Sequence, residues 1–293
     1  MTQPQKAPEK AQDKFKFQLS YLIPILASLI FGLACAYLLA PQPTESFPSP
    51  APIPETTPGA PVGNALYFVV LIGISATLFY ILIKRRSKRI IKGLITVAMT
   101  MASLLMSLIY LSAILAYLPS VDFLLIPLSI VITVLFDLAI FKLGSTARNI
   151  AVICVGGALG VFFGKFIPLW SAILILSFLA IYDVIAVYKG PVGKIAQSAE
   201  GAGLDQLQGL SFSFKDIQMG LGDLVFYSML TGVVFFNFLP SVFPTIMAVV
   251  GILAGSILTF FMLEKKGIFP GLPFPILLGL AFGLLSGFFF PLF

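Results

Sequence analysis

The sequence contains no histidine, and charged residues make up only 10% of its 293 residues. Without histidine, the chain cannot form a Ser-His or Cys-His catalytic pair or a histidine-ligated metal site. Its two cysteines, Cys35 and Cys154, lie inside apolar runs, where a packing role is expected and a disulfide framework is not. We therefore predict no metal and no cofactor.

Hydrophobic residues make up 59% of the chain, far more than a soluble domain needs. Apolar runs of about 20 residues recur along almost the whole length and predict an all-α polytopic membrane protein with nine transmembrane helices. The first run is too long for the core of a signal peptide, so we interpret it as an uncleaved helix. The predicted spans are 17–40, 66–83, 93–118, 121–141, 149–164, 167–188, 218–239, 241–263 and 271–292.

These spans divide the chain into a few segments. The predicted segments are a cytoplasmic tail at 1–16, helices one to six within 17–188, a proline-rich external loop at 41–65, a cytoplasmic loop at 189–217 and helices seven to nine within 218–293. With the N-terminus in the cytoplasm, 17 of the 18 Lys and Arg residues fall in inner segments, and only Lys165 lies outside. An error of one helix would destroy this separation, because positive charge concentrates in inner loops.

The net charge of +6 comes from short basic clusters at the ends of the predicted helices. Such clusters orient a membrane protein and contact anionic lipid headgroups. No basic domain lies outside the membrane, so we predict the bilayer as a partner and exclude nucleic acid. Oligomeric state is not predicted by these patterns.

Three aspartates lie well inside predicted spans: Asp137, Asp183 and Asp223. An aspartate near the centre of a spanning helix disfavours insertion by about 2.5–3.5 kcal/mol. Asp183 and Asp223 lie at similar depth near the cytoplasmic ends of consecutive helices. Two carboxylates within a few ångströms do not both ionise readily, so one can act as an acid and the other as a base. Asp137 lies at comparable depth, so depth alone does not select the pair.

Local sequence distinguishes Asp183 and Asp223. Gly220-Leu221-Gly222-Asp223 places two glycines just before the acid, so that a backbone or an extended substrate could approach closely. Tyr182 precedes Asp183 and could border a polar cavity. Asp137 is interpreted as an interfacial acid near Lys142 or Arg148. The alternative is that Asp183 and Asp223 form a buried pair that only joins two helices.

A proline-rich segment, Pro270-Gly271-Leu272-Pro273, opens the ninth span at the same predicted membrane face. Prolines at 270, 273 and 275 predict an extended backbone rather than an ordinary helix start, although a simple helix-start signal is the alternative. Glycines at four-residue spacing predict close helix packing. They form three groups: Gly156, Gly160 and Gly164; Gly251 and Gly255; and Gly279, Gly283 and Gly287.

Together, Tyr182-Asp183, Gly220-Leu221-Gly222-Asp223 and Pro270-Gly271-Leu272 resemble the motifs of the presenilin and signal-peptide-peptidase family of intramembrane aspartyl proteases. The detailed likeness covers about the last 125 residues, and the first five spans agree in number and orientation only. In that family the motifs are Tyr-Asp, Gly-x-Gly-Asp and Pro-Ala-Leu on helices six, seven and nine. Gly271 replaces the usual alanine here.

The resemblance implies that Asp183 and Asp223 are a catalytic dyad that hydrolyses transmembrane substrates through a water molecule. It implies that Tyr182 and residues 220–222 shape the active site, and that residues 270–273 bind substrate by strand pairing. The short loop at 189–217 resembles that of a compact prokaryotic or archaeal homologue in the cell membrane, with its site in the cytoplasmic half. The alternative function is proton- or cation-coupled transport through the same acids.

Overall fold

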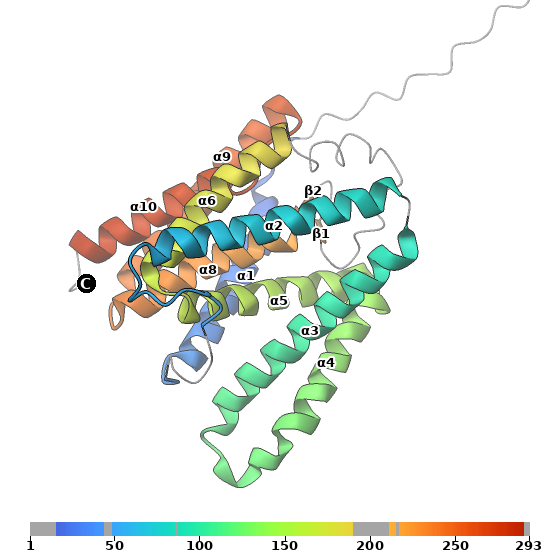
Figure 1. Ribbon diagram of the computed structural model, residues 1–293, viewed down its shortest axis with the longest axis vertical. Coiled ribbons are helices and arrows are strands. Elements are labelled where there is room, and N and C mark those ends of the chain that lie inside the picture. The colour runs from blue at the N-terminus through green and yellow to red at the C-terminus, as the bar shows by residue number, and fades with distance from the viewer. Residues whose placement is uncertain (1–15, 44–48, 86, 190–210, 215–216, 290–293) are drawn as a thin grey trace, which may run out of the picture.

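The computed structural model describes residues 16–43, 49–85, 87–189, 211–214 and 217–289 (Figure 1). These residues form nine α-helices, eight of them long and apolar enough to cross a membrane and the ninth, α10, a shorter apolar helix. The predicted all-α polytopic fold is therefore confirmed. The helices are α1 (Ile23–Leu39), α2 (Ala60–Lys84), α3 (Lys88–Leu115), α4 (Leu125–Phe141), α5 (Ser145–Phe166), α6 (Leu169–Tyr188), α8 (Leu221–Phe238), α9 (Phe243–Lys266) and α10 (Pro273–Phe289).

Helix α8 is the central helix of the bundle and contacts α1, α5, α6, α9 and α10. Two-thirds of its most apolar stretch is buried, whereas no residue in the corresponding stretch of α2 is buried. Figure 1 shows α2 lying along α6, and α3 and α4 projecting from the bundle as a hairpin. The predicted aspartates on α6 and α8 therefore lie in the more buried part of the molecule.

Glycines hold α5 against α8 and α9 against α10 at backbone distance, as the four-residue spacing predicted. A Cβ atom at Gly164 would lie 2.7 Å from the Met229 carbonyl oxygen on α8. At Gly255 it would lie 2.5 Å from the Phe274 carbonyl oxygen on α10. Backbone atoms cannot move aside as a flexible side chain can, so these positions require glycine.

All nine predicted helix starts differ from the observed ones by two to six residues; the third helix, for example, begins at Lys88 instead of 93. Three of these differences concern the external loop and the candidate site. The second helix begins at Ala60 instead of 66, after Gly59 in a left-handed conformation with φ of 80°. The seventh span begins at Leu221 instead of 218, because a β-hairpin of β1 (Ser211–Phe214) and β2 (Ile217–Gly220) precedes it. Helix α10 begins at Pro273 instead of 271. Pro273 and Pro275 therefore lie in its first turn, where a missing N–H costs no helical hydrogen bond, and not in the extended backbone that was predicted.

The predicted proline-rich loop is fastened to the bundle by polar contacts. Glu55 accepts hydrogen bonds from the backbone N–H of Ser171 at 3.1 Å and from its hydroxyl at 2.7 Å, close to the start of α6. Asn64 on α2 exchanges two hydrogen bonds of 2.9 Å with the backbone of Ile53 and donates a third to Ser171. The loop thus ties the first turns of α2 and α6 to each other.

Lys165, the one basic residue outside the predicted inner segments, is buried at the end of α5. Its ammonium group donates to the carbonyl oxygens of Leu39, the last residue of α1, and of Gln42, the latter at 2.6 Å. It also lies 5.3 Å from the ring centre of Phe236. A cation is favourable at a helix C-terminus, so this lysine caps α1.

Candidate active site

Asp183 lies in the last two turns of α6, half-buried, and points toward the segment before α10. Its Oδ2 atom accepts a hydrogen bond of 3.0 Å from the backbone N–H of Leu272. A backbone amide of an irregular segment therefore holds the carboxylate of Asp183.

Asp223 is the third residue of α8 and is also half-buried. Strand β2 leads directly into α8, with Gly220 as the extended N-cap residue at φ of −70° and ψ of 143°. A Cβ atom at Gly220 would lie 3.9 Å from Oδ2 of Asp223, so the carboxylate lies beside the N-cap residue. An acid in the first turn is stabilised by the helix dipole, so the strand-to-helix junction gives this carboxylate a favourable place.

The segment from Pro270 to Leu272 brings the two carboxylates together. A Cβ atom at Gly271 would lie 3.1 Å from Oδ2 of Asp223, while the next residue, Leu272, bonds to Asp183. Asp183 and Asp223 are close enough to interact electrostatically. The two predicted aspartates are thus adjacent in space, although Asp183 and Asp223 are 40 positions apart in the chain.

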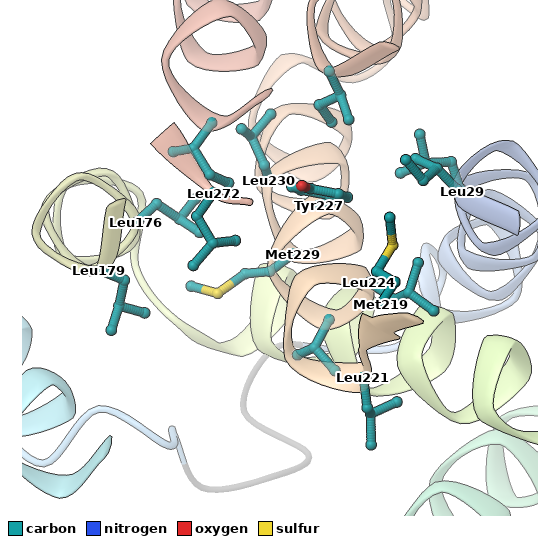
Figure 2. Packing of buried hydrophobic residues seen from close by; sticks show 14 of the residues in the cluster. Leu29, Leu176, Leu179, Met219, Leu221, Leu224, Tyr227, Met229, Leu230 and Leu272 are labelled. Carbon is teal, nitrogen blue, oxygen red and sulfur yellow. The ribbon is translucent and has the colours of Figure 1, made fainter. Parts of the chain in front are cut away.

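Tyr227 anchors this segment from the next turn of α8. Its hydroxyl donates a hydrogen bond of 2.9 Å to the carbonyl oxygen of Gly271, and the residue is only 2% exposed. Leu272 is buried and belongs to the same hydrophobic cluster as Tyr227, Leu176 and Leu230 (Figure 2). Packing on one side and hydrogen bonds on the other therefore hold the backbone of residues 270–272 against both acids.

The structure separates Asp137 from this pair. Asp137 is on α4, half-buried, and its Oδ2 atom accepts a hydrogen bond of 2.8 Å from the Thr100 hydroxyl on α3. Its other carboxylate oxygen has no hydrogen-bond partner among the residues that the structure describes. The acid thus serves the contact between α3 and α4.

Tyr182 lies against α2. Its ring and hydroxyl would each be 3.8 Å from a Cβ atom at Gly73. Among the other predicted residues, Leu221 and Pro270 are buried and Gly220 and Gly222 are exposed. The glycines before Asp223 therefore leave the start of α8 open on one side.

An apolar cavity of about 430 Å³ borders that open side. Helices α2, α5, α6 and α8 form its walls, with Gly222, Val225 and Met229 contributed by α8. Phe68 and Leu71 line it from α2. No residue in the apolar stretch of α2 is buried, so an exposed helix forms one wall of this cavity.

A smaller and more polar cavity of about 120 Å³ lies on the other side of α8. Met219, Asp223 and Tyr227 line it at four-residue intervals from β2 and α8. Ser256 and Thr259 face it from α9, and Gly271 closes one end. Asp223 thus faces a cavity whose walls carry several hydroxyl groups.

Sequence reasoning missed the β-hairpin and the hydroxyl groups of α9. The alternation of serine and phenylalanine over 211–214 has the two-residue period of a strand and could have revealed β1. Ser256 and Thr259 had no such signal, because hydroxyl residues are common in packed transmembrane helices. Only the three-dimensional arrangement places them near Asp223.

Comparisons with known proteins identify the family. The family model described as signal-peptide peptidase, presenilin aspartyl protease matches residues 38–202, more than half of the chain. Presenilin-B of Dictyostelium discoideum is 33% identical over 129 residues, which cover 41% of this chain and 26% of that protein. The chain therefore matches only about a quarter of this relative's length.

Two solved structures share the fold. Both are of a presenilin family intramembrane aspartate protease, in C222 and P2 space groups, with TM-scores of 0.65 and 0.63 and 20% sequence identity. The matches cover 92% and 94% of this chain, and 100% and 98% of the other. The family model and the shared fold together establish that this chain is an integral membrane protein that belongs to the signal-peptide-peptidase and presenilin family of aspartyl proteases.

Proposed function

We propose that the chain is an intramembrane aspartyl endopeptidase of the Gly-x-Gly-Asp type, with Asp183 and Asp223 as its catalytic dyad. One observation carries the proposal: two carboxylates from different helices meet at the same two residues, Gly271 and Leu272. A pair that only joined two helices would not need an irregular backbone and two cavities beside it.

In the proposed reaction, the ionised carboxylate removes a proton from water as the water oxygen attacks the carbonyl carbon of the scissile bond. The protonated carboxyl of the other aspartate gives its proton to the carbonyl oxygen, which produces a neutral tetrahedral intermediate. As the C–N bond breaks, the leaving nitrogen takes the proton that the first carboxylate received from water, and one hydroxyl of the intermediate returns its proton to the other carboxylate. The products are a carboxylic acid and an amine, and the dyad recovers its single proton without a covalent intermediate.

Residues 270–272 hold the dyad in place in this proposal. The Leu272 N–H is bonded to Asp183, the Gly271 carbonyl to Tyr227, and the Leu272 carbonyl to Ile276 in the first turn of α10. Strand pairing with substrate, which the family resemblance implies, would therefore use the Pro270 carbonyl or the second lone pair of the Gly271 carbonyl. Glycine at 271 leaves space for Asp223, which a larger residue would restrict.

We infer that the apolar cavity between α2, α5, α6 and α8 receives a side chain or an unwound turn of the substrate. The lining is almost entirely apolar, as transmembrane segments are, and it begins at Gly222, one residue before Asp223. The basic inner loops support a cytoplasmic N-terminus and cleavage in the cytoplasmic half of the cell membrane. The proposed substrates are single-span membrane proteins.

The test is cleavage of a single-span substrate in proteoliposomes that contain the full-length chain. Wild type should cleave it, and Asp183→Asn and Asp223→Asn should each reduce the rate below detection, because neither variant retains both an acid and a base. Asp137→Asn is the matched control, since it neutralises an acid at similar depth that lies outside the pair, and it should cleave like wild type. Normal cleavage by both dyad variants would refute the proposal.

The same vesicles test the transport alternative. A pH-sensitive dye inside them would report proton flux, and no such flux is expected from a protease. Flux that depends on Asp183 and Asp223, without any proteolysis, would favour a transporter.

A further inference from the structure

The polar cavity beside Asp223 has a feature that the dyad alone does not explain. The Thr259 side chain is 6% exposed, and its hydroxyl has no hydrogen-bond partner among the residues that the structure describes. Hydroxyl groups inside a helix usually donate to the carbonyl four residues earlier, as Ser256 does to Ile252 at 2.8 Å. Thr259 makes no such bond and instead faces the cavity.

The cavity has the properties of a water site. A buried water needs a polar surrounding with two to four partners. Asp223, Tyr227, Ser256 and Thr259 all contribute oxygen atoms to this lining. Its volume of about 120 Å³ is enough for several water molecules, each of which needs a space of about 10–15 Å³ for its centre.

Aromatic side chains close the cytoplasmic end of the cavity. Phe260, Leu263 and Phe269 line it there. Phe17 and Tyr21, from the segment before α1, place their rings 6.1 and 6.2 Å from the ring centre of Phe260. The Phe17 N–H also donates to Glu264 at the end of α9 at 3.0 Å. The segment before α1 therefore packs against the aromatic wall of the cavity.

The polar cavity and the substrate cavity lie on different sides of α8. The substrate cavity borders α8 through Gly222, Val225 and Met229, whereas the polar cavity borders it through Asp223 and Tyr227. These two sets occupy different faces of one helix. A water molecule in the polar cavity would reach the scissile carbonyl from the face opposite the substrate side chains.

We propose that this cavity holds the hydrolytic water, and that Thr259 and Ser256 are positioning residues that orient it toward Asp223. The inference rests on the proposed protease function and adds the source of the nucleophile. Ser256 already donates its hydrogen to Ile252, so its oxygen accepts a hydrogen bond from water, while Thr259 is free to donate one. Together they fix which lone pair of the water faces the substrate.

The test replaces Thr259 by valine, which keeps the shape and removes the hydroxyl. Thr259→Val should lower kcat about tenfold or more with little change in KM, because misplacing a reacting group slows chemistry without weakening substrate binding. Thr259→Ser restores the hydroxyl and should recover most of kcat. Ser256→Ala should have a smaller effect, and the double variant should lose less than the two separate losses combined, since both residues hold the same water.

Thr245 provides a matched control on the same helix. It is fully buried, and its hydroxyl likewise has no partner in the described part of the chain, but it lies about 21 Å along α9 from Thr259. Thr245→Val should leave kcat unchanged. If wild type and Thr259→Val cleave equally while Asp223→Asn is inactive, the water site is refuted and the protease function stands.

A second measurement does not depend on cleavage. Replacing a buried hydroxyl that has no partner by a methyl group is neutral or stabilising, whereas replacing one that holds water leaves the water short of a partner. Thr259→Val should therefore have a lower thermal midpoint than Thr245→Val in the same detergent. Equal midpoints would count against a bound water, even if the chain proved to have no protease activity.

Discussion

The first turns of α8 border two cavities that differ in polarity and size. On the α9 side, Asp223 and Tyr227 line a small cavity with hydroxyl groups around it. On the α2 side, Gly222, Val225 and Met229 line a cavity more than three times larger with almost no polar atoms. One helix thus separates a place suited to water from a place suited to a transmembrane substrate.

If the proposed function is correct, this contrast explains how hydrolysis is compatible with a membrane. Water and substrate have opposite solvation needs, and a single pocket that suited both would suit neither well. Placing the acid on the helix between two cavities lets each reactant keep its own surroundings until they meet at the dyad. The comparison holds only if changes on the α9 side affect chemistry and changes on the α2 side affect substrate binding.

The largest effect is expected at Gly271, which closes the polar cavity. A Cβ atom there would lie 3.1 Å from Oδ2 and 3.4 Å from the other two carboxylate atoms of Asp223. Gly271→Val adds two further methyl groups and should lower kcat about 100-fold, because displacing a catalytic group by about 1 Å has effects of that size. Steady-state cleavage kinetics in proteoliposomes would measure it.

Gly271→Ala makes a smaller change at the same position. Its single methyl requires Asp223 to move by only a few tenths of an ångström, so it should retain more activity than Gly271→Val. If valine is tolerated as well as glycine, the Asp223 carboxylate is not fixed by the segment, and the proposed role of residues 270–272 is wrong.

An intermediate effect is expected from Tyr227→Phe. The change removes the hydroxyl that bonds the Gly271 carbonyl at 2.9 Å and leaves that acceptor without its donor. An unpaired acceptor costs about 1–3 kcal/mol, and the backbone that holds both acids should loosen, so kcat should fall about 30-fold. KM should change little.

Tyr110→Phe is the matched control for Tyr227→Phe. The Tyr110 hydroxyl donates to the Ala158 carbonyl at 2.7 Å, which is the same kind of bond at another place, between α3 and α5. Both variants should lower the thermal midpoint, but only Tyr227→Phe should lower kcat. Equal losses of kcat would mean that general stability, rather than the geometry of the dyad, explains the effect.

Much of the fold could be predicted because its causes are local or statistical. Apolar length predicted nine helices, and glycine spacing predicted the close contacts at Gly164 and Gly255. The charge count singled out Lys165 but not its role, because the carbonyl oxygens that bind it come from the end of α1, more than 120 residues earlier. A pairing over that distance leaves no trace in a local pattern.

The main residues of the candidate site could also be predicted from the sequence. Asp183, Asp223 and Gly271 were recognised from motifs, and the structure brings them together. Predicted membrane depth did not exclude Asp137 from the candidate pair. Its hydrogen bond to Thr100 places it instead at the contact between α3 and α4. The boundary of α8 was misjudged because hydropathy averages over strand and helix alike, so Asp223 was predicted inside a span rather than in the first turn of α8.

The smallest effect is expected on the α2 side. Gly222 borders the apolar cavity, and a Cβ atom there would meet only the Phe226 ring, at an ordinary 3.8 Å. Gly222→Leu therefore fits the helix and extends into the space proposed for substrate. It should raise KM about fivefold and leave kcat nearly unchanged, because crowding that disfavours the bound substrate and the transition state equally weakens binding alone.

The outcome at Gly222 decides whether the two cavities have separate roles. Gly93→Leu makes the same change on α3, where nothing lies within 4 Å of the new Cβ atom, and should alter neither constant. If Gly222→Leu instead lowered kcat at constant KM, the α2 side would take part in the chemical step and the separation would fail. If it changed KM alone, then Gly222 and Asp223, one residue apart, would act on different reactants, because successive residues of a helix point about 100° apart.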